Sequence, residues 1–131
     1  MTASFPKAEK LVSNALIDSL FDKGSHSIVS YPLRLVYNVM SEEKIKQLTI
    51  DSRPAASVQV LVSVPKRCFK RAVKRNRVKR QIRDAYRRHK EQVSVKEGQR
   101  VIMAFVWLAP ELFPTATIEN KVTALLGKIR S

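Results

Sequence analysis

Lysine and arginine are the residues of this sequence whose number and spacing could do chemistry, and they gather in residues 66–90. This segment carries 13 of the chain's 25 Lys and Arg but one acid, Asp84, so it holds +12 of the formal net charge of +14. Charge this concentrated repels itself unless an external polyanion neutralises it. Lys and Arg neutralise phosphates and release their counterions, and Arg adds planar bidentate geometry. The segment therefore predicts a nucleic-acid-binding surface.

Residues 66–90 also have the pattern of an amphipathic helix, with neither Gly nor Pro between residues 72 and 90. One stripe at helical spacing is mainly apolar: Val78, Ile82, Ala85, Tyr86 and His89. Another face repeats a cation every four residues: Arg75, Lys79, Arg83 and Arg87. The helix can therefore rest on a core by one stripe and offer the other to phosphate. A solvated charged face is the alternative, but such faces normally mix both signs.

No catalytic or metal-binding constellation accompanies this helix. The two histidines, His26 and His89, lie far apart in sequence, and no Cys/His cluster has the spacing of metal ligands. Three widely separated glycines do not form a phosphate-binding loop. Cys68 is the single cysteine, so no internal disulfide forms, and no partner base near it suggests a nucleophile. We therefore do not expect an independent protein active site.

The length and composition favour one domain spanning residues 1–131. With 44% apolar residues the chain can bury a real core and is not a disordered basic tail. The N-terminus lacks the uninterrupted apolar region of a signal peptide, and no apolar run approaches the ~20 residues that cross a bilayer. We expect a soluble, cytoplasmic protein that does not contact membranes.

Hydrophobic periodicity assigns the elements that must position the basic helix. Helices are expected over residues 7–23 and 118–130, and strands over 33–40, 57–64 and 100–108. Residues 24–32 and 41–56 are expected to be connections. The order helix, strand, strand, helix, strand, helix predicts an α+β fold, a small α/β sandwich around a mixed sheet. The strand at 100–108 is apolar on both faces, which is typical of a central strand.

The first helix contains one ambiguity. Ile17 and Phe21 lie about 100° round the helix from Leu16 and Leu20. They could widen the core-facing stripe or line an open groove. Apolar helix residues are usually buried, so the pattern alone favours the core.

The order of elements argues against the common DNA-binding motifs. A basic-region leucine zipper would continue into heptads, but Gly98 and a buried strand follow this helix. A helix-turn-helix would place a second helix after a short turn, but Pro65 and a strand precede it. RNA, recognised by shape and phosphates, is the better candidate.

The segment KRAVKRNRVKRQIRDAYR, residues 70–87, closely resembles the signature of the bacterial ribonuclease P protein subunit. That signature is an Ala-Val pair followed by R-N-R-x-K-R-x-x-R, here Ala72-Val73, Arg75-Asn76-Arg77, Lys79-Arg80 and Arg83. The preceding run from Val62 to Arg67 looks like the strand end that leads into paired basic residues in this family. Chain length and element order also match, so the resemblance spans nearly the whole chain.

The resemblance implies an accessory subunit of a ribonucleoprotein endoribonuclease, with no catalytic residues of its own. The partner would be a catalytic RNA that uses magnesium to remove the 5′ leader of precursor tRNA, with no obligatory protein partner and no metal held firmly by the protein. The implied RNA-subunit contacts are Lys66, Arg67, Arg71, Arg75, Asn76, Arg77, Lys79, Arg80 and Arg83. The family fold also implies a left-handed crossover around the basic helix, against the general preference for right-handed ones.

The resemblance further implies a leader-binding groove between the first helix and the sheet. Its matching positions are Ile17 and Phe21 on the helix and Leu35 and Tyr37 on the strand, which reverses the preference for core burial of the first two. Bases could stack on Phe21 and Tyr37. Two alternatives stay open: a general RNA-binding or ribosomal assembly protein with no role in cleavage, and an autonomous metal-dependent nuclease. The latter would need clustered acids that the sequence does not show.

Overall fold

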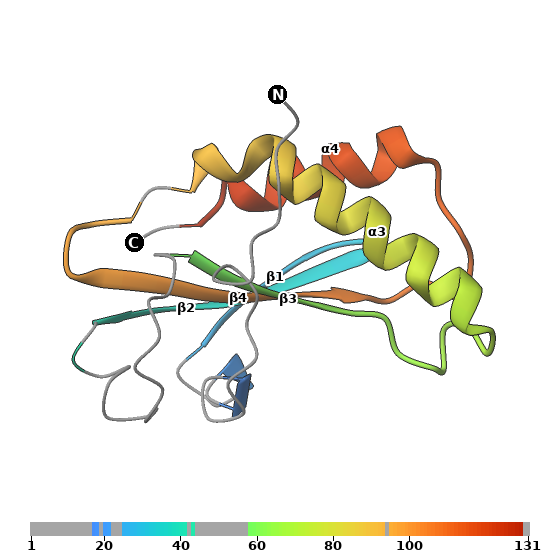
Figure 1. Cartoon of the computed structure of the whole chain (residues 1–131), viewed down its shortest axis with the longest axis horizontal. Coiled ribbons are helices and arrows are strands. Elements are labelled where there is room, and N and C mark those ends of the chain that lie inside the picture. The colour runs from blue at the N-terminus through green and yellow to red at the C-terminus, as the bar shows by residue number, and fades with distance from the viewer. Residues whose placement is uncertain are drawn as a thin grey trace.

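The computed structural model describes residues 17, 18, 20, 21, 25–41, 43, 58–93 and 95–129. In chain order the elements are β1 (His26–Ser30), β2 (Leu33–Ser41), β3 (Val58–Ser63), α3 (Ala72–His89), the short 3-10 helix η2 (Lys90–Gln92), β4 (Gln99–Trp107) and α4 (Thr115–Leu126). The strands form one sheet in the order β1-β2-β4-β3. Both α3 and α4 cover the same face of this sheet, the upper face in Figure 1.

The sheet is mixed, which confirms the predicted α+β class. β2 pairs antiparallel with β1 and with β4, and β3 pairs parallel with β4. Parallel neighbours require a crossover connection, and α3 supplies it. The left-handedness of this crossover remains a prediction from the family resemblance. β4 lies between β2 and β3 and is buried along most of its length, as its apolar sequence predicted.

The main core lies between the sheet and the two helices. The predicted apolar stripe of α3 is buried in it through Val78, Ile82, Ala85 and Tyr86. The sheet contributes alternate residues of β2 and β4, and α4 contributes one stripe beside that of α3: Leu33, Leu35, Tyr37, Met103, Phe105, Trp107, Ile118, Val122 and Leu125. Each large apolar side chain buried in this way contributes about 1.5–3 kcal/mol. The core therefore fixes the orientation of α3, and with it the direction of the arginines.

A second, smaller cluster lies on the opposite face of the sheet. It consists of Leu20, Val36, Met40, Ile102 and Ala104, with Ile17 and Leu61 packed against it. Ile17 and Leu20 therefore lie under the sheet, away from α3 and α4 (Figure 1). The two faces of β2 consequently meet different partners.

Two assignments differ from the sequence expectation. Residues 26–30, expected in a loop, form the edge strand β1, which needs only Ile28 to pack on the core and takes its hydrogen bonds from β2. α4 begins at Thr115, three residues early, and Pro114 occupies its N-cap position. Gly98, with φ of 79°, makes the expected turn into β4. Most of the helix expected at 7–23 and of the connection at 41–56 lies outside the described residues.

In the described part of the chain, no helix is long and apolar enough to cross a membrane.

Candidate RNA interface

α3 presents its central cations on the side away from the core. Arg77, Arg80 and Arg83 are exposed, together with Asn76, and Lys79 is half-buried. Asn76, Lys79, Arg80 and Arg83 line a shallow hollow of about 350 Å³ that also includes Asp84 and Arg87. Arg77, Arg80 and Arg83 make no ion pair with the described residues. The surface that the sequence predicted for phosphate is therefore assembled on one rigid helix.

Arg75 is used differently from the other signature arginines. Its side chain is half-buried, and Nη1 donates hydrogen bonds to the backbone carbonyls of Phe69 (2.7 Å) and Lys70 (2.9 Å). These carbonyls belong to the loop that leads into α3, whose N-cap residue Arg71 makes no side-chain capping bond. The guanidinium of Arg75 therefore ties the loop to the first turn of the helix, and is only partly available to RNA.

The segment from Pro65 to Arg71 carries the other predicted contacts. Lys66, Arg67 and Arg71 are exposed, as expected of residues that meet RNA. Cys68 is buried between them, and its thiol donates a weak hydrogen bond to the carbonyl of Trp107 at 3.6 Å. Cys68 thus anchors the basic segment, defined here as residues 65–71, to the end of β4.

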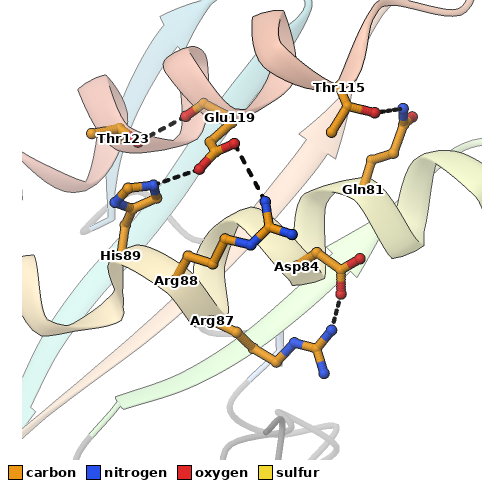
Figure 2. Close-up of polar contacts among 8 residues, drawn as sticks. All are labelled: Gln81, Asp84, Arg87, Arg88, His89, Thr115, Glu119 and Thr123. Atoms are coloured by element: carbon orange, nitrogen blue, oxygen red, sulfur yellow. Dashed lines mark hydrogen bonds and ion pairs between the residues drawn. The ribbon is translucent and has the colours of Figure 1, made fainter. Parts of the chain in front are cut away.

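The acidic side chains Asp84 and Glu119 form pairs with basic side chains of α3. Asp84 pairs with Arg87, three residues on, rather than with Arg80 or Arg88 at four residues' distance. On α4, Glu119 lies 2.9 Å from Nε2 of His89 and 3.5 Å from Nη1 of Arg88 (Figure 2). These pairs leave the charge of the exposed arginine row uncompensated.

The contact between α3 and α4 is partly polar. Nε2 of Gln81 donates to the hydroxyl of Thr115 at 2.9 Å, at the other end of the contact from His89 and Glu119 (Figure 2). The hydrogen bond with His89 lowers the pKa of Glu119 below its ordinary value of 4.5. Partial burial of the carboxylate raises this pKa, and the positive charge of Arg88 lowers it further. Glu119 is therefore ionised wherever the protein is near neutral pH.

The four predicted leader residues are not brought together. Leu35 and Tyr37 are buried in the main core under α3 and α4, and Tyr37 is only 5% exposed and stacks on His26 with ring centroids 5.0 Å apart. Ile17 packs on the opposite face, and Phe21 beside it is 56% exposed. The prediction that Leu35 and Tyr37 line an open groove is therefore wrong.

The residues of β2 that share a face with Ile17 are Val36 and Met40, one position out of phase with the prediction. Arg34 is exposed and stands on the same face by strand alternation, where Nε donates to Oγ of Ser27 at 2.8 Å. The sequence did contain a signal. Leu33, Leu35, Tyr37 and Val39 form the more apolar phase of β2, which suits the larger core beneath two helices.

Among the residues that the structure describes, the side chains do not fit a resident magnesium site. Within the described ranges, His, Cys, Asp and Glu form no group of three or more that could hold a metal ion. Asp84 and Glu119 are already paired with cations.

Known proteins resemble this chain along nearly its whole length. The model of the ribonuclease P family, described as "Ribonuclease P", matches residues 5–130. A ribonuclease P protein component of Porphyromonas gingivalis is 37% identical over 131 residues, which cover 98% of this chain and 88% of the relative.

Solved structures agree in fold. The RNase P protein of Thermotoga maritima gives a TM-score of 0.68 at 16% identity, covering 94% of this chain and 99% of that one. The RNase P protein of Staphylococcus aureus gives 0.63 at 22% identity, covering 92% and 94%. The sheet with its two covering helices is thus shared, and the signature residues Asn76, Arg77, Arg80 and Arg83 are exposed on α3. The chain therefore belongs to the ribonuclease P protein family, the accessory protein subunits of a ribonucleoprotein endoribonuclease that acts in tRNA 5′ maturation.

Proposed function

We propose that this chain binds the catalytic RNA of ribonuclease P through α3 and the basic segment, and that the RNA performs the hydrolysis. The observation that carries the proposal is the row of Arg77, Arg80 and Arg83, exposed on a helix whose opposite stripe is locked in the core. Such a row neutralises phosphates at fixed spacing, at little cost in conformational entropy of the backbone.

The start of α3 supports an anionic partner. Its first turn contains no acid, although the helix dipole makes that end positive and favours negative charge there. Lys70, Arg71 and Lys74 instead add positive charge to it. A phosphate backbone would relieve this repulsion, because it supplies the anions that the chain itself lacks.

Magnesium belongs, in this proposal, to the RNA subunit, which would use it to activate the attacking water. The protein contributes only positive charge and shape. It would lower the electrostatic repulsion between the RNA subunit and the precursor tRNA, and so reduce the magnesium concentration that cleavage needs.

The 5′ leader of the precursor would meet the face of the sheet opposite α3 and α4. Phe21 is the exposed aromatic on that side, and Arg34 supplies a cation on the same face of β2. Stacking of a base on Phe21 is tolerant of sequence, which suits leaders that differ between tRNAs. We expect the complex to act in the cytoplasm and to need no other protein.

Cleavage of precursor tRNA at low magnesium tests the proposal. The protein alone, the catalytic RNA alone and the two together are compared at equal substrate concentration. Strong cleavage is expected only from the two together. Cleavage by the protein alone would identify an autonomous nuclease, and a protein that binds RNA without stimulating cleavage would be a general RNA-binding protein.

A further inference from the structure

An exposed aromatic surface lies apart from the signature residues. Tyr31, in the turn between β1 and β2, is 52% exposed. Its ring packs on that of Phe113 in a T-shaped arrangement, with centroids 6.1 Å apart, and Phe113 in turn packs on the fully buried Trp107 with centroids 5.6 Å apart. The ring of Tyr31 is therefore held from the core side while much of its surface is open to solvent.

This aromatic surface is joined to the basic segment through the end of β4. The backbone N–H of Leu108 donates to the carbonyl of Pro32 at 2.8 Å, which holds the turn against β4. The carbonyl of Trp107, one residue earlier, accepts the hydrogen bond from Cys68 in the basic segment. The turn and the approach to α3 therefore share one end of the sheet, on the right in Figure 1.

An aromatic ring beside concentrated positive charge suits one ligand chemistry in particular. Cations hold a phosphate backbone, and an open ring then receives an unpaired base from the same strand. The charge complementarity is strong, since Lys66, Arg67, Lys70 and Arg71 are all exposed. An acidic protein would match the charge as well, but it would have no specific need for an exposed aromatic ring supported by a second ring.

We propose that Tyr31 is a stacking platform for an unpaired nucleobase of an RNA strand whose phosphates run along the basic segment. This inference rests on the proposed binding of RNA by α3 and adds a second kind of contact to it. The base could come from the RNA subunit or from the precursor tRNA, which offer the same chemistry. The platform lies outside the signature and does not involve Phe21.

Two substitutions at position 31 separate stacking from other roles. Tyr31→Ala should weaken binding of RNA by about fivefold or more, because it removes the ring, whereas Tyr31→Phe keeps the ring and should bind as the wild type does. The salt dependence of binding should be the same for all three proteins, since no phosphate contact is changed. Val29→Ala, a truncation at a neighbouring residue that is 60% exposed, is the matched control and should have no effect.

The source of the base follows from two titrations. The protein is titrated with the isolated RNA subunit, and the assembled holoenzyme is titrated with precursor tRNA. A loss in the first titration alone assigns the base to the RNA subunit, and a loss in the second alone assigns it to the precursor. Equal affinity of Tyr31→Ala and wild type in both would overturn the platform, and so would an equal loss in Tyr31→Phe.

A crosslinking experiment gives a second readout that does not depend on affinity. Tyr31→Cys provides an exposed thiol for a photoreactive label, while the native Cys68 is buried and the labelled wild type serves as the control. Crosslinks to unpaired nucleotides are expected, and crosslinks confined to paired helices would contradict stacking. Stimulation of cleavage by the wild-type protein is measured beside both experiments. If the wild type stimulates cleavage but Tyr31 has no role in binding, only the stacking proposal fails. If the wild type does not stimulate cleavage, the proposed function fails.

Discussion

Two arginines of the signature show that the same residue type can serve different ends. Arg80 is exposed and makes no ion pair with the described residues, whereas Arg75 donates to the carbonyls of Phe69 and Lys70. Both were predicted to contact RNA from their sequence positions. Only the contacts of the folded chain distinguish the side chain that can reach a phosphate freely from the one that ties down a loop.

Arg80→Ala should weaken binding to the RNA subunit and reduce the slope of log K against log salt by about one. Arg75→Ala should instead lower the free energy of unfolding by about 1–2 kcal/mol, since two hydrogen bonds from a charged, half-buried group are lost. Binding at several salt concentrations and urea unfolding followed by Trp107 fluorescence measure the two effects. Arg77→Ala is a control that should behave like Arg80→Ala. A smaller slope without loss of stability in Arg75→Ala would show that Arg75 chiefly contacts phosphate.

Phe21 and Tyr37 make the second contrast at this scale. Phe21→Ala should weaken the affinity of the holoenzyme for precursor tRNA with a long leader and leave the affinity for leaderless tRNA unchanged. Tyr37→Ala should reduce stability by about 3 kcal/mol through loss of core packing, with little effect on the leader. Thermal unfolding of each protein, beside the two binding measurements, checks both expectations. If Tyr37→Ala instead weakened leader binding without loss of stability, the prediction that Tyr37 lines a leader-binding groove would be correct after all.

At the scale of elements, the contact between α3 and α4 holds the arginine row in place. Ile82 of α3 and Ile118 of α4 are buried in the same core, and polar pairs from Gln81 and His89 join the two helices beside it. Ile82→Ala should therefore lower the free energy of unfolding by about 2–5 kcal/mol, as measured by urea unfolding. The exposed Val73→Ala is the matched truncation on the same helix, and a comparable loss there would show that burial does not set the cost.

The pair of His89 and Glu119 gives this contact a pH dependence. The pKa of Glu119 is lowered in the folded protein, so its contribution to stability is complete above the ordinary value of 4.5 and is lost as the pH falls through the lower, folded value. Glu119→Gln should therefore lower Tm near neutral pH, and the difference from the wild type should vanish in acid below that range. Thermal unfolding from pH 7 down to strongly acidic conditions tests the prediction. A difference in Tm that is constant with pH would mean that the carboxylate charge is irrelevant.

At the scale of the whole molecule, charge and core are segregated. The charge is concentrated in residues 66–90, while the rest of the chain adds only +2 of the net +14. If six of the exposed cations, Lys66, Arg67, Arg71, Arg77, Arg80 and Arg83, each meet a phosphate, affinity for the RNA subunit should fall about a thousandfold between 50 and 200 mM salt. Titrations across that range measure the slope, and a nearly salt-independent affinity would contradict binding through this surface.

The sequence by itself determined the elements whose pattern is local. The four-residue repeat of cations and the apolar stripe around Ile82 predicted α3, and alternation predicted β2 and β3, because period and charge are properties of neighbouring residues. The apolar run at 100–108 likewise predicted the central strand. β1 escaped prediction because an edge strand with one packed side chain, Ile28, leaves almost no pattern.

The tertiary structure alone decided which partner each face meets. Periodicity showed that Leu35 and Tyr37 share one face of β2 and Val36 and Met40 the other. The greater apolarity of the first face favoured the larger core, but only the fold showed that α3 and α4 cover that face. Periodicity could not show that Arg75 reaches the carbonyl of Phe69 or that Tyr31 rests on Phe113. These are contacts between separate segments, and their geometry arises only when the whole core closes, so no local pattern encodes them.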